Sequence, residues 1–133
     1  MIRRTLRIGR WLVYFLFATD GYEEDVIVSF LQTFEASGTV LKRAREIMET
    51  GALDRGFTFA NEHIRRAVVV VGPSSSGAEF LDTFTHEVRH LADSIAKSIG
   101  YELDMEEPAY LTGDTVRELA EVVCLLGCSR CNG

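Results

Sequence analysis

The chain has 133 residues, of which 47% are hydrophobic, and a formal net charge of −6 at pH 7. This length and apolar content predict a single domain, residues 1–133, with one hydrophobic core. The acidic balance gives no general attraction to phosphate backbones, and the one conspicuous basic cluster is Arg3, Arg4, Arg7 and Arg10. We therefore expect no nucleic-acid partner.

The N-terminal third predicts a strand followed by helices. Residues 5–18 contain the run WLVYFLFA, which is apolar on both alternating sets and is typical of a strand covered on both faces. A basic head before a short apolar run also resembles the start of a secretory signal, but the small-residue cleavage pattern is missing and the run is too short to span a bilayer. We therefore expect a strand and no membrane segment. Residues 26–48 carry apolar side chains at helical spacing with a break at Gly38, which predicts two short helices.

The middle of the chain predicts further strand structure. Residues 56–72, GFTFANEHIRRAVVVVG, indicate either one long strand or a hairpin that turns near Asn61 and Glu62. With the first strand this makes a small antiparallel or mixed sheet of two to three strands. Because helices precede and follow it, the expected fold class is α+β.

Two helices are expected in the C-terminal half. The first begins at Ser76, which opens an S-x-x-E capping box, and ends at Gly100. The second begins at a similar box at Asp104 and extends to about Leu126. The sheet is expected to pack on both helices.

The first of these helices carries the motif HEVRH, residues 86–90. Residues four apart lie one turn along the same helix face, so His86 and His90 can direct two imidazole nitrogens at one metal ion. Glu87 lies about 100° round the helix from His86, where it can reach a water on that ion but is poorly placed to bind it. A helical projection puts both histidines opposite the apolar stripe, so they border either a cleft or plain solvent.

A catalytic zinc site needs a third protein ligand. The extended motif HExxHxxGxxH is excluded, because Asp93 stands where its glycine would be and Ala96 where its last histidine would be. The remaining usual source is a carboxylate from the following helix, which predicts Glu106, or Glu107 if that helix begins one residue later. Close approach of this helix to the histidine helix would explain Gly113 at a mid-helix position.

HEVRH followed by E-x-x-A, here Glu106 to Ala109, resembles the gluzincin branch of the zinc metallopeptidases. It is also similar in outline to small phage and mobile-element proteins that combine T-HE-x-x-H with E-x-x-A-Y-L-x-G, here residues 85–90 and 106–113. The resemblance covers about residues 68–113. It implies a minimal zincin-like domain in which the two histidines and the downstream glutamate bind zinc.

The same resemblance implies zinc-dependent hydrolysis of a peptide or protein substrate, with Glu87 taking the proton of a zinc-bound water. Zincins run a strand along the cleft and bind extended peptides to its edge, and the strand before the helix fits this place. In the resembled family an Asp or Asn usually follows E-x-x-A and accepts a hydrogen bond from a zinc-binding histidine. Tyr110 stands at this position here, so that role is vacant or taken by Asp93. Tyr110 is the favoured candidate for an oxyanion stabiliser, and Arg117, Tyr101 and His63 are further candidates.

Two alternatives remain open from the sequence. One is a zinc-binding protein without catalytic activity that binds a partner within a phage or mobile-element operon, with the metal serving stability. The other is a chain without metal, in which the polar stripe around the histidines is simply solvated.

The three cysteines lie close to the C-terminus, at Cys124, Cys128 and Cys131. An odd, terminal set is no disulfide framework, which agrees with a reducing, cytoplasmic location. The CxxC within it could be half of a zinc or redox site, but no second CxxC supplies the other ligands. We therefore expect reduced thiols at a helix end.

Overall fold

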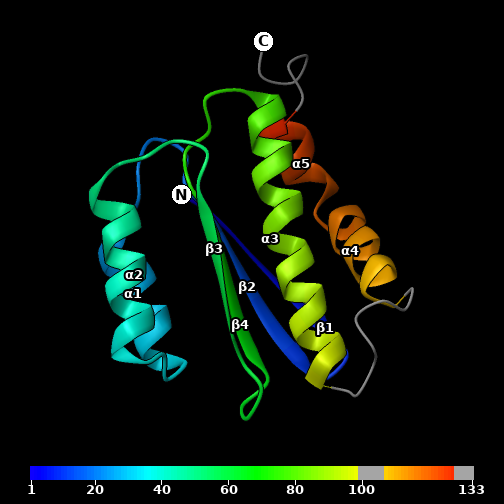
Figure 1. Ribbon diagram of the computed structural model, residues 1–133. Coiled ribbons are helices and arrows are strands. Elements are labelled where there is room, and N and C mark those ends of the chain that lie inside the picture. The colour runs from blue at the N-terminus through cyan, green and yellow to red at the C-terminus, as the bar shows by residue number, and fades with distance from the viewer. Residues whose placement is uncertain (99–106, 128–133) are drawn as a thin grey trace.

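The computed structural model describes residues 1–98 and 107–127, and of residues 107–110 it describes the backbone but not the side chains. Over these ranges the chain forms three layers, with a central sheet between helices on both faces (Figure 1). The elements in chain order are β1 Ile2–Ile8, β2 Trp11–Phe17, α1 Glu24–Thr33, α2 Gly38–Glu49, β3 Gly56–Asn61, β4 Arg66–Val71, α3 Gly77–Ser98, α4 Glu107–Glu118 and α5 Ala120–Gly127.

The sheet is mixed, in the order β1-β2-β4-β3. β1 and β2 are antiparallel, β2 and β4 are parallel, and β4 and β3 are antiparallel. The expected α+β class is confirmed, but the sheet has four strands, so the expectation of two to three strands is wrong. The parallel contact arises because α1, α2 and β3 lie between β2 and β4 in the chain.

The extra strand comes from the N-terminal segment, for which the sequence predicts one strand over residues 5–18. It instead folds back as a hairpin in which Ile8 pairs with Trp11. Gly9 begins the two-residue loop with a φ of 57°, a left-handed conformation that glycine adopts at little steric cost. Apolar residues before and after the loop of Gly9 and Arg10 make the segment appear continuous in sequence.

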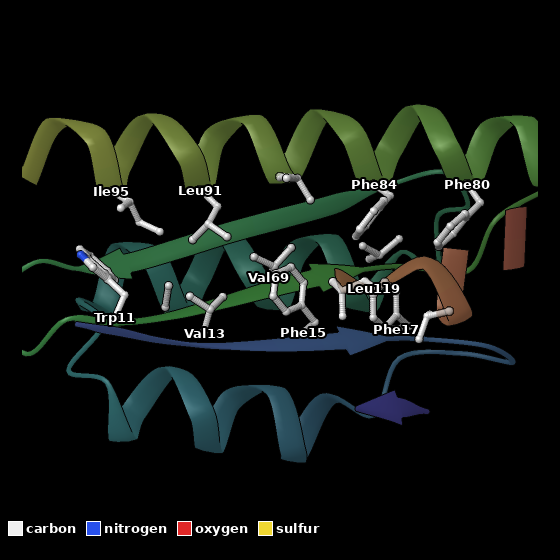
Figure 2. Close-up of a cluster of buried hydrophobic side chains, with 14 residues drawn as sticks. Trp11, Val13, Phe15, Phe17, Val69, Phe80, Phe84, Leu91, Ile95 and Leu119 are labelled. Carbon is white, nitrogen blue, oxygen red and sulfur yellow. The ribbon is translucent and has the colours of Figure 1, made fainter. Parts of the chain in front are cut away.

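Both faces of the two inner strands are buried, as the sequence predicts for β2. On one face α1 and α2 cover Leu16, Val68 and Val70. On the other face, α3 contributes an apolar stripe that packs on the sheet (Figure 2). The residues of this stripe are Phe80, Phe84, Val88, Leu91 and Ile95, and they meet Trp11, Val13, Phe15, Phe17 and Val69.

The helix starts follow their capping residues. The two short helices expected within residues 26–48 are confirmed as α1 and α2, and the Ser37 side chain accepts a hydrogen bond from the Val40 N–H at the start of α2. Ser76 Oγ accepts from the Glu79 N–H at 3.1 Å, which confirms the expected start of α3. The expected stop at Gly100 lies outside the described residues.

The last expected helix, Asp104 to Leu126, is interrupted at Leu119 and forms α4 and α5. Just before the interruption, Thr115 Oγ1 donates to the Leu111 carbonyl at 2.7 Å. Such a bond competes with the helical pattern and bends helices. Leu119 is itself buried against the core that α3 shares with the sheet, so the bend keeps both short helices on the same layer.

Two further expectations concern the membrane and the cysteines. Among the described residues, no helix is long and apolar enough to cross a membrane. Cys124 on α5 is disulfide-bonded, so the expectation of a reduced thiol is wrong at this position. Cys128 and Cys131 lie outside the described residues.

Candidate functional site

A cleft of about 540 Å³ lies between β3 and the exposed side of α3. β3 is the edge strand of the described sheet, and α3 packs against both β3 and β4. The cleft lining includes Gly56, Phe57 and Thr58 from β3 and His86, Glu87, His90 and Asp93 from α3. The motif residues of α3 that the sequence singles out therefore face a cleft.

The position of the two histidines follows from the amphipathic pattern of α3. Phe84, Val88 and Leu91 of the apolar stripe are each at most 1% exposed, whereas His86 and His90 are exposed. The prediction that the histidines lie away from the core is therefore confirmed. Burial of one face fixes the rotation of the helix about its axis, and this rotation directs both imidazoles away from the sheet.

The two imidazoles converge on one point. His86 Nε2 and His90 Nε2 are 3.0 Å apart, and the rings meet at 82°. Two imidazole nitrogens bound to one tetrahedral zinc ion, each about 2.05 Å from it, lie about 3.3 Å apart. The pair therefore fits a shared metal ion with little adjustment. A direct N–H···N hydrogen bond between the rings has the same spacing, and the two arrangements differ in whether one ring nitrogen carries a proton.

Glu87 differs from its histidine neighbours because it is buried, with 5% of its surface exposed. Its carboxylate Oε1 accepts a hydrogen bond from Thr58 Oγ1 at 3.0 Å, and the same hydroxyl lies 3.2 Å from the Glu87 carbonyl oxygen. A carboxylate so placed reaches solvent through the cleft that it lines. The helical projection indicates the direction of Glu87 but gives no sign of this burial, because β3 provides the cover.

Gly56 brings β3 close to α3 at this point. A Cβ at Gly56 would lie 2.6 Å from the Val70 carbonyl oxygen and 3.0 Å from Glu87 Cγ. Any side chain there would push the strand away from the helix, so the absence of a Cβ permits the Thr58–Glu87 contact. Neither Gly56 nor Thr58 is a functional residue in the sequence-based prediction, and the only signal available is a pair of small side chains two apart on one strand face.

The open edge of β3 carries main-chain groups of three residues. The pattern follows from bonds at the ends of β4. The Gly72 N–H donates to the Arg55 carbonyl at 2.7 Å, whereas the Val71 carbonyl is directed the other way, to the Ala18 N–H beyond β2. Because an antiparallel ladder alternates between bonded and open pairs, the groups directed to β4 are those of Phe57 and Phe59. The N–H and C=O groups directed to the open edge are those of Gly56, Thr58 and Ala60.

This edge differs from the expected one. The resemblance assigns the cleft to the strand before the helix, but β4, which directly precedes α3, is paired on both sides by β2 and β3. The strand with an open edge along the cleft is β3, one strand earlier in the chain. The β3–β4 hairpin, which turns at residues 62–65, explains the difference because it folds β3 outside β4.

The remaining predicted residues are only partly described. Asp93 lines the cleft, where its Oδ1 accepts from Arg89 Nε at 2.9 Å. Glu106 lies outside the described residues, and Tyr110 lies on α4 in the range whose side chains are not described. Within residues 1–98 and 107–127, no group of three or more His, Cys, Asp or Glu side chains gathers to hold a metal ion. Of the candidate ligands, the structure describes the side chains of the two histidines only.

α4 packs against α3, as expected, but not through the face that carries Gly113. Gly113 is exposed, and no described atom lies within 4 Å of a Cβ placed there. Arg117, a candidate oxyanion stabiliser, is exposed and pairs with Asp114 at 2.9 Å instead of lining the cleft. The α4 face that packs inward carries Thr115, which is 4% exposed. The face of α4 that carries Gly113 is therefore its outer face.

No protein-family model, curated protein or solved structure matches this chain.

Proposed function

We propose that this protein is a zinc-dependent peptidase. The observation that carries the proposal is the convergence of His86 Nε2 and His90 Nε2, 3.0 Å apart, in a cleft that also contains the Glu87 carboxylate. Two imidazoles and a neighbouring carboxylate are the groups that metal-assisted hydrolysis requires from one helix. The open edge of β3 beside them offers a place for an extended chain.

In this proposal zinc is held by His86, His90 and a third ligand, for which Glu106 is the candidate and Glu107 the substitute. The spacing of the two described nitrogens supports one shared ion. When bound, such an ion supplies a water of lowered pKa and polarises a carbonyl group. The third position is a prediction from sequence, as are the oxyanion role of Tyr110 and the outer-partner role of Asp93.

Glu87 is the proposed general base and acid. Its carboxylate lines the cleft beside the imidazoles without being one of the converging groups, so it is available to accept a proton from a water and return it to the leaving amine. Burial at 5% exposure and the bond from Thr58 hold it in one place. A base held in this way loses little entropy when it reacts.

An extended peptide is the proposed substrate form. The outward N–H and C=O groups of Gly56, Thr58 and Ala60 can pair with a peptide main chain, because an open strand edge is a template for another strand. The peptide would then lie along the cleft, with a bond near the two histidines. Main-chain pairing favours unfolded segments and gives little selectivity for side chains.

The test separates metal binding from chemistry. In protein purified without a His tag, Glu87→Gln is expected to keep stoichiometric zinc and to lower hydrolysis of denatured, fluorescently labelled casein by about 10²- to 10⁴-fold. Asp82→Asn, an exposed acid on the same helix outside the cleft lining, is the matched control and should keep full activity. Unchanged hydrolysis by Glu87→Gln would refute the proposed role of Glu87.

A zinc-binding protein without catalysis is the second candidate. The Thr58 hydrogen bond favours this second candidate, because it satisfies the buried Glu87 carboxylate without any reaction. Under this candidate the wild-type protein holds zinc, shows no hydrolysis and binds a partner, which by the sequence resemblance would be encoded in a phage or mobile element. The cytoplasmic location expected from the sequence loses one of its supports, because Cys124 is disulfide-bonded and disulfides are rare in reducing compartments.

A further inference from the structure

Thr58 connects the strand edge to Glu87 through a single residue. Its N–H and C=O face the open edge of β3, while its side chain points across the cleft wall to α3. The hydroxyl donates to Glu87 Oε1 at 3.0 Å. The main chain of Thr58 therefore belongs to the open strand edge, while its side chain bonds to the Glu87 carboxylate on α3.

The hydroxyl makes contact at two points of the helix turn. Besides Oε1, the carbonyl oxygen of Glu87 lies 3.2 Å from Thr58 Oγ1. These contacts restrict both the rotamer of Glu87 and the distance between strand and helix. Gly56, two residues earlier on the same strand face, contributes to this close packing, because a Cβ placed on it would lie 3.0 Å from Glu87 Cγ.

We infer that Thr58 is a positioning residue, which fixes the Glu87 carboxylate relative to a peptide paired with β3. The inference rests on the proposed peptidase function and adds a residue outside the HExxH motif to it. If the edge of β3 shifts, the Thr58 hydroxyl shifts with it. The hydrogen bond from this hydroxyl then keeps the Glu87 carboxylate at one position relative to the substrate main chain. Positioning errors of this kind reduce the rate of reaction more than they reduce binding.

The test compares Thr58→Val, which keeps the shape and removes the hydroxyl, with Thr58→Ser, which keeps the hydroxyl. With the zinc-loaded full-length chain and labelled casein, Thr58→Val is expected to lower kcat about tenfold, the loss typical of one charge-assisted hydrogen bond, with KM within about twofold. Thr58→Ser is expected to restore most of kcat. Thr5→Val, on the opposite edge strand β1, controls for loss of a strand hydroxyl.

A second readout does not depend on activity. In crystal structures of the two variants, Glu87 should leave its present rotamer in Thr58→Val and keep it in Thr58→Ser, with zinc content unchanged in both. A merely structural hydroxyl would instead lower the Tm of Thr58→Val and leave kcat of the folded fraction intact.

The outcomes separate the two levels of the proposal. An active wild-type protein whose Thr58→Val variant retains kcat and the Glu87 rotamer overturns the role of Thr58 and leaves the peptidase proposal standing. A zinc-loaded wild-type protein without hydrolysis overturns both. A parallel fall of kcat in Thr58→Val and Thr58→Ser also contradicts the inference, because the hydroxyl would then not be the cause.

Discussion

His86 and His90 lie on consecutive turns of α3 with their Nε2 atoms 3.0 Å apart and their ring centroids 4.6 Å apart. Nothing in helix geometry alone requires the side chains to converge, because each imidazole has two free torsions. Both rings are exposed, so burial does not drive them together either. Either a zinc ion shared by the two rings or a direct N–H···N hydrogen bond between them makes this arrangement favourable.

Each histidine is expected to be necessary for metal binding. His86→Ala and His90→Ala should each lower zinc affinity by more than about 100-fold, since loss of an outer partner alone costs about 10- to 100-fold. The measurement is competition with a chromophoric chelator. His63→Ala is the matched control, because this third histidine lies exposed in the β3–β4 turn and should leave zinc affinity unchanged. Equal affinity in all three variants would exclude the pair as the zinc site.

The third ligand is expected to be Glu106. Glu106→Gln should weaken zinc binding to the extent that a histidine change does, while Glu107→Gln, the same change one residue later, should leave it within about twofold, because a capping carboxylate contributes only helix stability. Competition titration of the two variants decides between them. The reverse result would assign the ligand to Glu107, and no effect in either would place the ligand elsewhere.

Removal of zinc is expected to lower thermal stability. At a free zinc concentration of about 100 times Kd, binding stabilises the folded state by about 2.7 kcal/mol, which corresponds to several degrees in Tm for a chain of this size. Calorimetry with and without a chelator measures the shift. The His86→Ala/His90→Ala double variant should show no zinc-dependent shift; a shift of equal size in that variant would point to another site.

Substitutions at two glycines are expected to have opposite effects. Gly56→Ala should destabilise the fold by about 1–3 kcal/mol, the usual cost of forcing an atom into a packed site, because its Cβ would lie 2.6 Å from the Val70 carbonyl oxygen. Gly113→Ala should stabilise it by up to about 1 kcal/mol, because alanine is the better helix former and the described surroundings are open. Chemical denaturation of both variants gives the two signs; a neutral Gly56→Ala would contradict the tight packing of Gly56 against β4 and α3.

The local sequence was sufficient where one element decides the outcome. The capping residue Ser76 and the apolar spacing from Phe80 to Ile95 were enough to predict the start of α3 and the face that it buries. The placement of His86 and His90 away from the core follows from the same periodicity. These features depend on contacts within one helix and on its single apolar face, which the order of residues determines directly.

The tertiary structure decided what depends on pairing between distant segments. The sequence does not reveal that Gly9 turns one expected strand into two, or that β3 folds outside β4 and takes the open edge. Burial of Glu87 and its bond to Thr58 follow only from that arrangement, since the two residues are 29 positions apart. Strand order is set by the total burial of many side chains, and short apolar runs allow several pairings of similar pattern. The helix face that carries the motif was therefore readable from sequence, whereas the strand that completes the cleft was not.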